Sequence, residues 1–296
     1  LARRWRPRAV VLLYHRVAET SDDPYGQAVA PARFESHLAL LRREYHVASL
    51  ESLVEKLDRR DYPDRTVAVS FDDGYADNLA AAAPLALRQE VPLTVFVTVE
   101  PVVEGTPFWW DELAGALGPQ ADGATRERLH AELKRLPGGE RRRRLAAIRS
   151  ASPAGAAGTD GADRGAPLSP SGLRELAALP GVTIGAHTLS HPSLAALAEG
   201  EQARELAGGR ARLEELLGRP VTLLAYPFGK PGDVAPETRR LAAGAGYRAA
   251  FTSAAGRIVP SSPRFALPRL TVHDGSPEAL AQRLSECFAE PAPRPL

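Results

Sequence analysis

The sequence lacks several features that mark other classes of protein. Its 296 residues include one cysteine, Cys287, which excludes an internal disulfide framework and a cysteine-rich zinc or iron–sulfur site. The 37 Lys and Arg residues balance 36 Asp and Glu residues, which argues against a protein that binds nucleic acid mainly through phosphate contacts. We therefore expect no nucleic-acid partner, and we expect Cys287 to be a buried apolar residue.

Long apolar runs are also absent near the start of the chain. Ala9–Tyr14 is far shorter than the roughly 20 residues that cross a bilayer. Arginines precede this run, but His15 and Arg16 end it early and no small-residue cleavage site follows. We expect no stable membrane span and, without a signal, a cytoplasmic protein. Because the chain begins at Leu1 and contains no methionine, a removed leader or anchor is the alternative.

Short apolar runs alternate with stretches of helical period, which predicts an α/β fold with parallel strands. The predicted strands are Ala9–Tyr14, Thr66–Phe71, Leu93–Thr98, Val182–Ala186, Val221–Tyr226, Ala249–Thr252 and Leu267–Val272. The predicted helices are Pro31–Arg43, Leu50–Leu57, Asn78–Arg88, Ser171–Ala178, Glu201–Leu217 and Pro236–Ala245. Their continuous alternation favours a single domain over residues 1–290, built as a (β/α) barrel that is closed or incomplete. An open doubly wound sheet is the alternative.

One segment, residues 118–170, contains no predicted strand. An Arg-rich helical stretch, Thr125–Arg149, is followed by an Ala/Gly/Ser-rich run, Ser150–Gly165. We interpret the segment as an insertion made of a helical flap and a flexible tether. The run Arg141–Arg144 is expected to form the solvated face of the helix, with a patch for an anionic polymer as the alternative. Residues 291–296 are expected to be a disordered tail.

Two adjacent carboxylates follow the predicted strand Thr66–Phe71. Asp72 and Asp73 precede Gly74, whose conformational freedom permits a turn that aims both inward. The C-terminal ends of strands are where catalytic groups gather in α/β folds, and two carboxylates so close together repel each other unless a cation is near. The motif indicates either a catalytic site or a solvated Asp-Asp-Gly turn.

Two histidines follow the predicted strand Val182–Ala186. His187 and His191 are four residues apart, a spacing that puts both imidazoles on the same side of a helical turn and lets them bind one metal ion. Alone, such a pair is more often two half-exposed loop histidines. Together with Asp73 it forms a set of two histidines and one carboxylate, which leaves coordination positions open for water and substrate. We therefore predict a divalent metal site at these two strand ends.

Two further strand ends carry candidate residues. Phe228 lies in the run Ala225-Tyr226-Pro227-Phe228-Gly229, a turn that can present a backbone N–H to an oxyanion, since the preceding proline has none to donate. His15 ends the first strand. It becomes a candidate because the other strand ends carry the predicted metal set.

The runs Ser70–Gly74, His187–His191 and Tyr226–Gly229, in this order and at these separations, resemble the motifs of the polysaccharide deacetylase family, the NodB-homology group of carbohydrate esterase family 4. The resemblance covers most of the chain apart from the insertion. Tyr14-His15 and the Tyr-Pro-Phe-Gly form further resemble the branch of bacterial poly-N-acetylglucosamine deacetylases, in which the order of the motifs is circularly permuted. The resemblance implies a distorted, often incomplete (β/α) barrel.

Carried over position by position, the resemblance also implies roles for these residues. Asp72 is the general base that deprotonates a metal-bound water, and His15 is the general acid that protonates the leaving amine. The metal and the backbone N–H of Phe228 stabilise the oxyanion. The metal itself, commonly zinc with cobalt or nickel as alternatives, is held by Asp73, His187 and His191.

The sequence departs from the family pattern in one motif. Ala225 stands where most members have an arginine that positions the base. We hypothesise that Arg269, at the start of a late strand, reaches Asp72 from another direction. The usual acid of the family lies in a late Leu-x-His motif, which His273 matches one residue out of register. His273 is therefore the rival of His15 as the acid.

Aromatic residues supply the candidate substrate contacts. Trp109 and Trp110 lie in the loop that follows Leu93–Thr98, and adjacent rings of this kind can stack on sugar rings. Tyr226 is a further candidate for substrate binding. The alternative is that one tryptophan anchors the insertion against the barrel.

The motifs together predict a metal-dependent hydrolase that removes N-acetyl groups from a glucosamine-containing polysaccharide or oligosaccharide. The same site would suit a deacylase that removes acetyl or formyl groups from a small glycosylated or lipid-linked metabolite, or an O-acetyl esterase, because loops select the substrate. A carbohydrate-binding protein with a degenerate site is the alternative from another class. The intact Asp72 argues against it, since a binding module needs no base. The sequence leaves the oligomeric state open.

Overall fold

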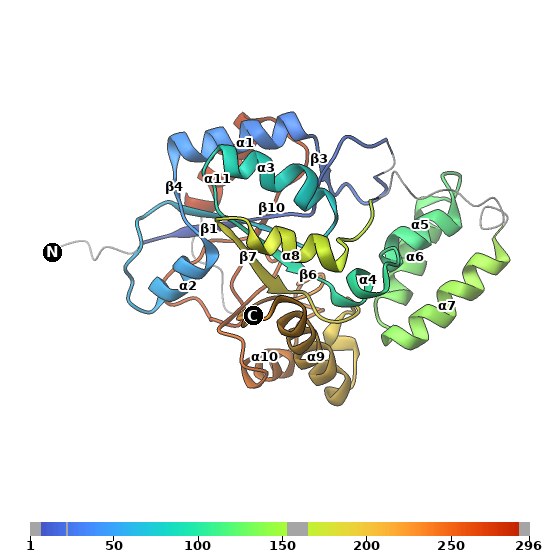
Figure 1. Ribbon diagram of the computed structural model, residues 1–296. Helices are drawn as coiled ribbons and strands as arrows, with labels where there is room; N and C mark the ends of the chain where they lie inside the picture. Colours follow the sequence, from blue (N-terminus) through green and yellow to red (C-terminus); the bar gives the residue numbers. More distant parts are fainter. Residues whose placement is uncertain (1–6, 22, 153–164, 290–296) are drawn as a thin grey trace.

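Parallel strands form the centre of the molecule in the computed structural model, which describes residues 7–21, 23–152 and 165–289 (Figure 1). The hydrogen-bonded order is β10-β1-β5-β6-β7-β8-β9, and β4 pairs with the start of β5. The strands are β1 (Ala9–Tyr14), β4 (His46–Val47), β5 (Thr66–Phe71), β6 (Leu93–Val97), β7 (Val182–Ala186), β8 (Leu223–Ala225), β9 (Ala249–Phe251) and β10 (Leu270–Thr271). All seven predicted strands are present.

The sheet curls into an incomplete barrel, as predicted. Its end strands, β9 and β10, are linked by one isolated bridge between Phe251 and Leu267, just before β10. A separate two-stranded sheet joins β2 (Arg16–Val17) and β3 (Ala28–Val29). The two-residue strands β2, β3 and β4 were not predicted, because so short a run has no readable hydrophobic period.

Successive side chains along β1 point to opposite faces of the sheet and enter two different cores. Val10 and Leu12 belong to the outer core, which the surrounding helices cover, whereas Ala9 and Val11 belong to the inner core of the barrel. Every residue of β1 and of β5 is buried. Strands covered on both faces read as continuous apolar runs, which is why these two were predicted with correct bounds.

Helices cover the outside of the sheet at the six predicted places, and a further helix follows β10 (Figure 1). Proline occupies the first turn of α1, α8 and α10, where its missing N–H has no helical partner to lose. The helices are α1 (Pro31–Glu44), α2 (Leu50–Leu57), α3 (Ala83–Arg88) with a preceding π-helical turn (Asn78–Ala82), α8 (Pro170–Ala178), α9 (Glu199–Leu217), α10 (Pro236–Gly244) and α11 (Pro277–Ala289), with a short 3-10 helix at Leu194–Ala196. Within the described residues, no helix is long and apolar enough to cross a membrane.

The helices α5, α6 and α7 group together on the right of Figure 1. Four described helices lie between β6 and α8, starting before residue 118 of the predicted insertion, and we call this group the insertion. They are α4 (Val99–Glu104), α5 (Trp109–Leu117), α6 (Gly123–Leu133) and α7 (Gly138–Ala151). This group has its own hydrophobic core, to which Phe108, Leu113, Leu129 and Leu145 contribute.

Three expectations for this region are corrected. The helical stretch Thr125–Arg149 is two helices, because Pro137 and the following glycines start a new one at Gly138. Trp109 and Trp110 begin α5 rather than lie in a loop. Within Arg141–Arg144, the last three arginines are exposed as expected, but Arg141 is buried.

Other expectations concern the C-terminal part of the chain and the tether. Cys287 is buried, as predicted. Most of the expected tether, and the expected tail 291–296, lie outside the described residues.

Candidate active site

The predicted site residues meet at the carboxyl edge of the sheet. His15 follows β1, Asp72 and Asp73 follow β5, His187 follows β7 and Phe228 follows β8. These residues line a cavity of about 410 Å3 together with His191 and His273. The parallel sheet explains the convergence, because all its strands end at the same edge.

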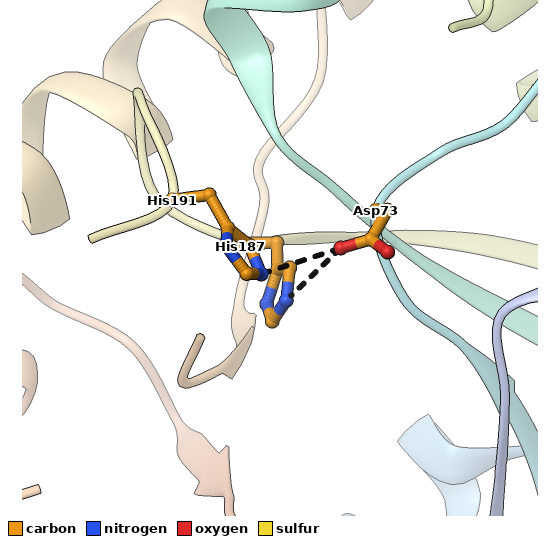
Figure 2. Close-up of side chains that lie close together, drawn as sticks. All are labelled: Asp73, His187 and His191. Carbon is orange, nitrogen blue, oxygen red and sulfur yellow. Dashed lines mark ion pairs between the residues drawn. The ribbon is translucent and has the colours of Figure 1, made fainter. Parts of the chain in front are cut away.

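Asp73, His187 and His191 form the candidate metal centre (Figure 2). One ligand atom from each residue lies within 4.8 Å of the others. The Asp73 Oδ1 atom is 3.6 Å from His187 Nε2 and 3.3 Å from His191 Nε2. Figure 2 shows both imidazoles pointing toward this one carboxylate oxygen.

Neighbouring backbone fixes the direction of His187. Its Nδ1 lies 2.8 Å from the carbonyl oxygen of Ala225, and a carbonyl only accepts, so Nδ1 carries the proton. Nε2 is therefore unprotonated, and its lone pair points toward Asp73. This is the tautomer that a metal ligand requires. Ala225 thus orients His187 through its backbone carbonyl.

The backbone is left-handed at three residues of this centre. The φ angles are 74° at Asp73, 68° at Thr188 and 60° at His191. Such conformations are costly for residues other than glycine and persist where surrounding contacts impose them. The amide of Thr98 donates to the Asp73 carbonyl at 3.0 Å, and the amide of His191 donates to Thr188 Oγ1 at 3.1 Å.

The polar atoms of this centre fit a divalent cation. Asp73 Oδ1 and His191 Nδ1 are buried, and neither has a hydrogen-bond partner among the described residues. Burial, and then the neighbouring charges of Asp72 and Asp111, raise the pKa of Asp73 well above its ordinary value. An unpaired buried carboxylate that faces two imidazole nitrogens lacks a positive charge, and two histidines with one carboxylate are a common ligand set for such ions.

Asp72 is paired with Arg269. The two guanidinium NH groups donate to the two carboxylate oxygens, each at 2.7 Å. Arg269 is fully buried, and its Nε donates to the carbonyl of Thr252 at 2.9 Å. The hypothesised contact is therefore present. Burial alone would raise the pKa of Asp72, but Arg269 and His187 outweigh it and hold that pKa below its ordinary value.

His15 and His273 both line the cavity, in different surroundings. Burial lowers the pKa of His15 to about 4, although Asp72 opposes this shift. The carbonyl of His15 accepts a hydrogen bond of 3.0 Å from Asn78 Nδ2. His273 is exposed, with Nδ1 3.1 Å from the Gly26 carbonyl.

Phe228 occupies a tight turn after β8. Its φ angle is 60°, and that of Gly229 is 63°. A Cβ atom on Gly229 would lie 2.5 Å from the amide nitrogen of Ser253, so only glycine fits there. The Phe228 ring stands 4.8 Å from the ring of His191.

Tyr226 does not face the cavity. Its ring belongs to the outer core, and its hydroxyl donates to the carbonyl of Phe265 at 3.1 Å. Tyr226 therefore lies apart from the residues that line the cavity.

The two tryptophans are buried and perpendicular, with an angle of 84° between their rings. They form no shared flat platform. Trp110 lines the cavity, 4.5 Å from the ring of His191. Trp109 Nε1 donates to the carbonyl of His191 at 3.3 Å, so this side chain ties the insertion to the metal centre, in agreement with the anchoring alternative.

The insertion adds cavity residues that the sequence analysis did not identify. His130 on α6 and Lys134, the residue directly after the end of this helix, line the cavity together with Tyr25. Their four-residue spacing on one helical face was the available signal. Lys134 pairs with Asp233 at 2.8 Å and lies 4.6 Å above the Phe228 ring.

Known proteins resemble this chain in sequence and in fold. Residues 59–250 match the polysaccharide deacetylase family. YxkH of Bacillus subtilis (strain 168), named for that family, is 20% identical over 267 residues, which are 90% of this chain and 71% of YxkH. The Streptococcus pyogenes deacetylase PplD, solved in complex with acetate, has a TM-score of 0.66 at 18% identity, covering 95% of this chain and 99% of its own. IcaB from Ammonifex degensii has a TM-score of 0.66 at 21% identity, covering 96% and 98%.

Proposed function

This chain belongs to the polysaccharide deacetylase family, and from that premise we propose that it is a metal-dependent hydrolase that removes N-acetyl groups from a glucosamine-containing polysaccharide or oligosaccharide. The observation that carries the proposal is the buried cluster of Asp73, His187 and His191 beside the Arg269-paired Asp72, in one cavity. A binding module has no need of such a paired carboxylate.

The metal centre would supply the nucleophile. A divalent cation bound by Asp73, His187 and His191, zinc in our proposal and cobalt or nickel as alternatives, lowers the pKa of a water from 15.7 to about 7 and polarises a carbonyl. The chain's part is to hold the three ligand atoms toward one point. His187 does so through its hydrogen bond to Ala225.

Asp72 is the proposed general base. Its lowered pKa keeps the carboxylate ionised at neutral pH, ready to accept a proton from the attacking water. Two hydrogen bonds from Arg269 fix the plane of this carboxylate. General base catalysis of this kind contributes about 10²–10⁴-fold in rate.

His15 is the proposed general acid for the leaving amine. Because burial lowers its pKa to about 4, its imidazole is neutral at neutral pH before reaction. It can protonate the amine only once it is itself protonated, and the proton that Asp72 has taken from the water is the available source, which returns Asp72 to its ionised form. His273, also at the cavity, is the alternative acid. The backbone N–H of Phe228 is the proposed donor to the oxyanion.

The cavity has room for a short substrate or for the end of a chain. Its volume of about 410 Å3 is near the lower limit of the roughly 300–1,000 Å3 that small-molecule sites span. His130 of the insertion helix α6 and Lys134, directly after that helix, form part of the cavity wall. This wall supports a second candidate function, deacylation of a small glycosylated or lipid-linked metabolite at the same site.

Acetate release from N-acetylglucosamine oligomers of increasing length tests both functions. The protein is stripped of metal and reconstituted with Zn2+, Co2+ or Ni2+, and Asp72→Asn serves as the control. Release that requires metal and Asp72 supports the deacetylase, and rates that rise with chain length support the polymer. No release at any length, with metal bound, contradicts the oligosaccharide substrate and favours the small metabolite.

A further inference from the structure

Arg141 is a cation buried inside the insertion. It lies on α7 and is 3% exposed, whereas Arg142, Arg143 and Arg144 beside it are exposed. Burial lowers the pKa of Arg141 to about 10, which leaves it charged at neutral pH. Burying a charge is costly unless the charge is well hydrogen-bonded. The hydrogen bonds that Arg141 makes therefore indicate its role.

The guanidinium of Arg141 binds the loop that carries His191. One NH group donates to the carbonyl of His191 at 3.3 Å, and another donates to the carbonyl of Ser190. The guanidinium also lies 5.2 Å above the ring of Trp109, whose indole N–H donates to the same His191 carbonyl. Two insertion side chains therefore hold the backbone of one candidate metal ligand.

A buried carboxylate holds the opposite side of the same loop. Glu205 on α9 accepts from the amides of Leu189 and Ser190 at 3.0 and 2.9 Å, and from the Ser190 hydroxyl at 2.7 Å. The loop therefore lies between two buried charged side chains. Its amides donate to Glu205, and its carbonyls accept from Arg141. Such contacts on both sides are what a loop with left-handed residues requires.

The backbone of the insertion also contacts this loop directly. The amide of Ser193 donates to the carbonyl of Lys134 at 2.7 Å. A Cβ atom on Gly138, the first residue of α7, would lie 2.9 Å from Ser190 Oγ. The insertion is therefore packed against the metal centre as well as along the cavity wall.

We propose that Arg141 is a positioning residue for the metal site, which holds His191 in its ligating position and so makes metal affinity depend on the docking of the insertion. The proposal rests on the proposed function in one respect, that Asp73, His187 and His191 bind a divalent ion. Residues outside the ligand set that orient a ligand typically change metal affinity about 10–100-fold when replaced.

Metal affinity of Arg141 variants tests this role. Zn2+ dissociation constants are measured by competition with a chromogenic chelator for the unchanged protein, Arg141→Gln and Arg141→Lys. We expect Arg141→Gln to weaken Zn2+ binding about 10–100-fold. Arg141→Lys should have a smaller effect, because an ammonium keeps the charge but lacks the planar fork. The visible spectrum of the Co2+-loaded protein should also change in Arg141→Gln, since it reports the geometry around the ion.

Two controls separate positioning from general loss of stability. Arg142→Gln removes the exposed neighbour on the same helix, which pairs with Glu100 at 3.0 Å, and it should leave affinity and spectrum unchanged. Leu284→Ala leaves a cavity in the outer core, where Leu284 of α11 is buried. It should lower the melting temperature without changing the Zn2+ dissociation constant. If Arg141→Gln does not fold, Arg141→Lys with these controls decides the question.

The possible outcomes are distinguishable. Unchanged affinity and spectrum in the Arg141 variants, with metal bound by the unchanged protein, overturn the positioning role alone. An affinity loss in Leu284→Ala equal to that in the Arg141 variants overturns it as well, because stability would then explain the effect. Absence of metal binding by the unchanged protein overturns the proposed function together with this inference.

Discussion

Arg269 holds both carboxylate oxygens of Asp72, with two hydrogen bonds of 2.7 Å between residues 197 positions apart in the sequence. The Arg269 side chain is fully buried, and that of Asp72 is 5% exposed. A planar guanidinium that binds both oxygens fixes the position and the plane of the carboxylate. The proposed base is therefore held by the residue that directly precedes the last strand of the barrel.

Replacement of Arg269 should impair both rate and stability. Arg269→Ala leaves Asp72 buried without its cation, and breaking a buried pair costs about 3–5 kcal/mol. A displaced base should lower kcat/KM by about 10²-fold or more. The stability and kcat/KM of Arg269→Lys should lie between those of Arg269→Ala and the unchanged protein, because lysine keeps the charge but lacks the planar guanidinium. Urea unfolding and acetate release measure the two effects.

Arg264→Ala is the matched control for the Arg269 variants. Arg264 pairs with Asp58, whose side chain is 77% exposed, so water can replace the partner. We expect little change in stability or rate. Normal activity in Arg269→Ala would remove Arg269 from the proposed mechanism.

Metal binding should be visible without any substrate. Zinc that binds only the folded protein stabilises it by about 2.7 kcal/mol at a free concentration of 100 times its Kd, so the melting temperature should rise when zinc is added to the stripped protein. This rise should disappear in His191→Ala and in Asp73→Asn.

The same melting experiment also measures the stability of Asp73→Asn without metal. Without metal, this variant should be at least as stable as the unchanged protein, because it removes a buried carboxylate whose Oδ1 has no partner among the described residues. A large loss of stability in metal-free Asp73→Asn would show that the carboxylate is compensated in some other way.

The two candidate acids should respond differently to alanine. His15→Ala should lower turnover by about 10²–10⁴-fold, the usual contribution of a general acid. His273→Ala should lower it much less, because His273 is exposed at the rim of the cavity. Single-turnover rates of acetate release make the comparison, and the reverse order would assign the acid to His273.

The insertion should make the protein sensitive to mild acid through His130. Burial, and then Lys134, lower the pKa of His130 to about 4 from its ordinary value of 6.5, while Asp233 opposes the shift and Lys230 adds to it. Between these two values the unfolded chain binds the proton and the folded chain does not. Stability should therefore fall as the pH is lowered from about 6.5 to about 4.

His130→Gln removes this contribution, so its unfolding free energy should fall less over the same range. Urea unfolding at pH 6.5 and at pH 4.5 gives the comparison. The other buried histidines contribute equally to both proteins. A fall in His130→Gln as steep as that of the unchanged protein would contradict the assignment to His130.

The sequence could predict the barrel strands and the centre of the site for the same physical reason. Strands buried on both faces, such as β1 and β5, read as continuous apolar runs. Residues directly after such strands share one edge of the sheet, so Asp73 and His187 could be expected to meet.

The contacts of the insertion could not be predicted in this way. Arg141 stands among four arginines, and composition favoured solvent exposure for all of them. One signal was present: Arg141 lies one turn before the buried Leu145 and so shares its helical face. Glu205 gave no signal, because its partners are two amides and a hydroxyl of a loop about 15 residues earlier.

The place where β9 meets the segment before β10, which we call the seam of the barrel, has a consequence for the order of folding. Residues just before β10 connect to β9 through the isolated Phe251–Leu267 bridge, and β10 pairs with β1 at the other end of the chain. Contacts between residues distant in sequence form slowly, because their loops must first close. We therefore expect the seam to form after the individual β/α units. Asp72 gains its guanidinium only at that step, so recovery of activity during refolding should lag behind recovery of helical and strand content.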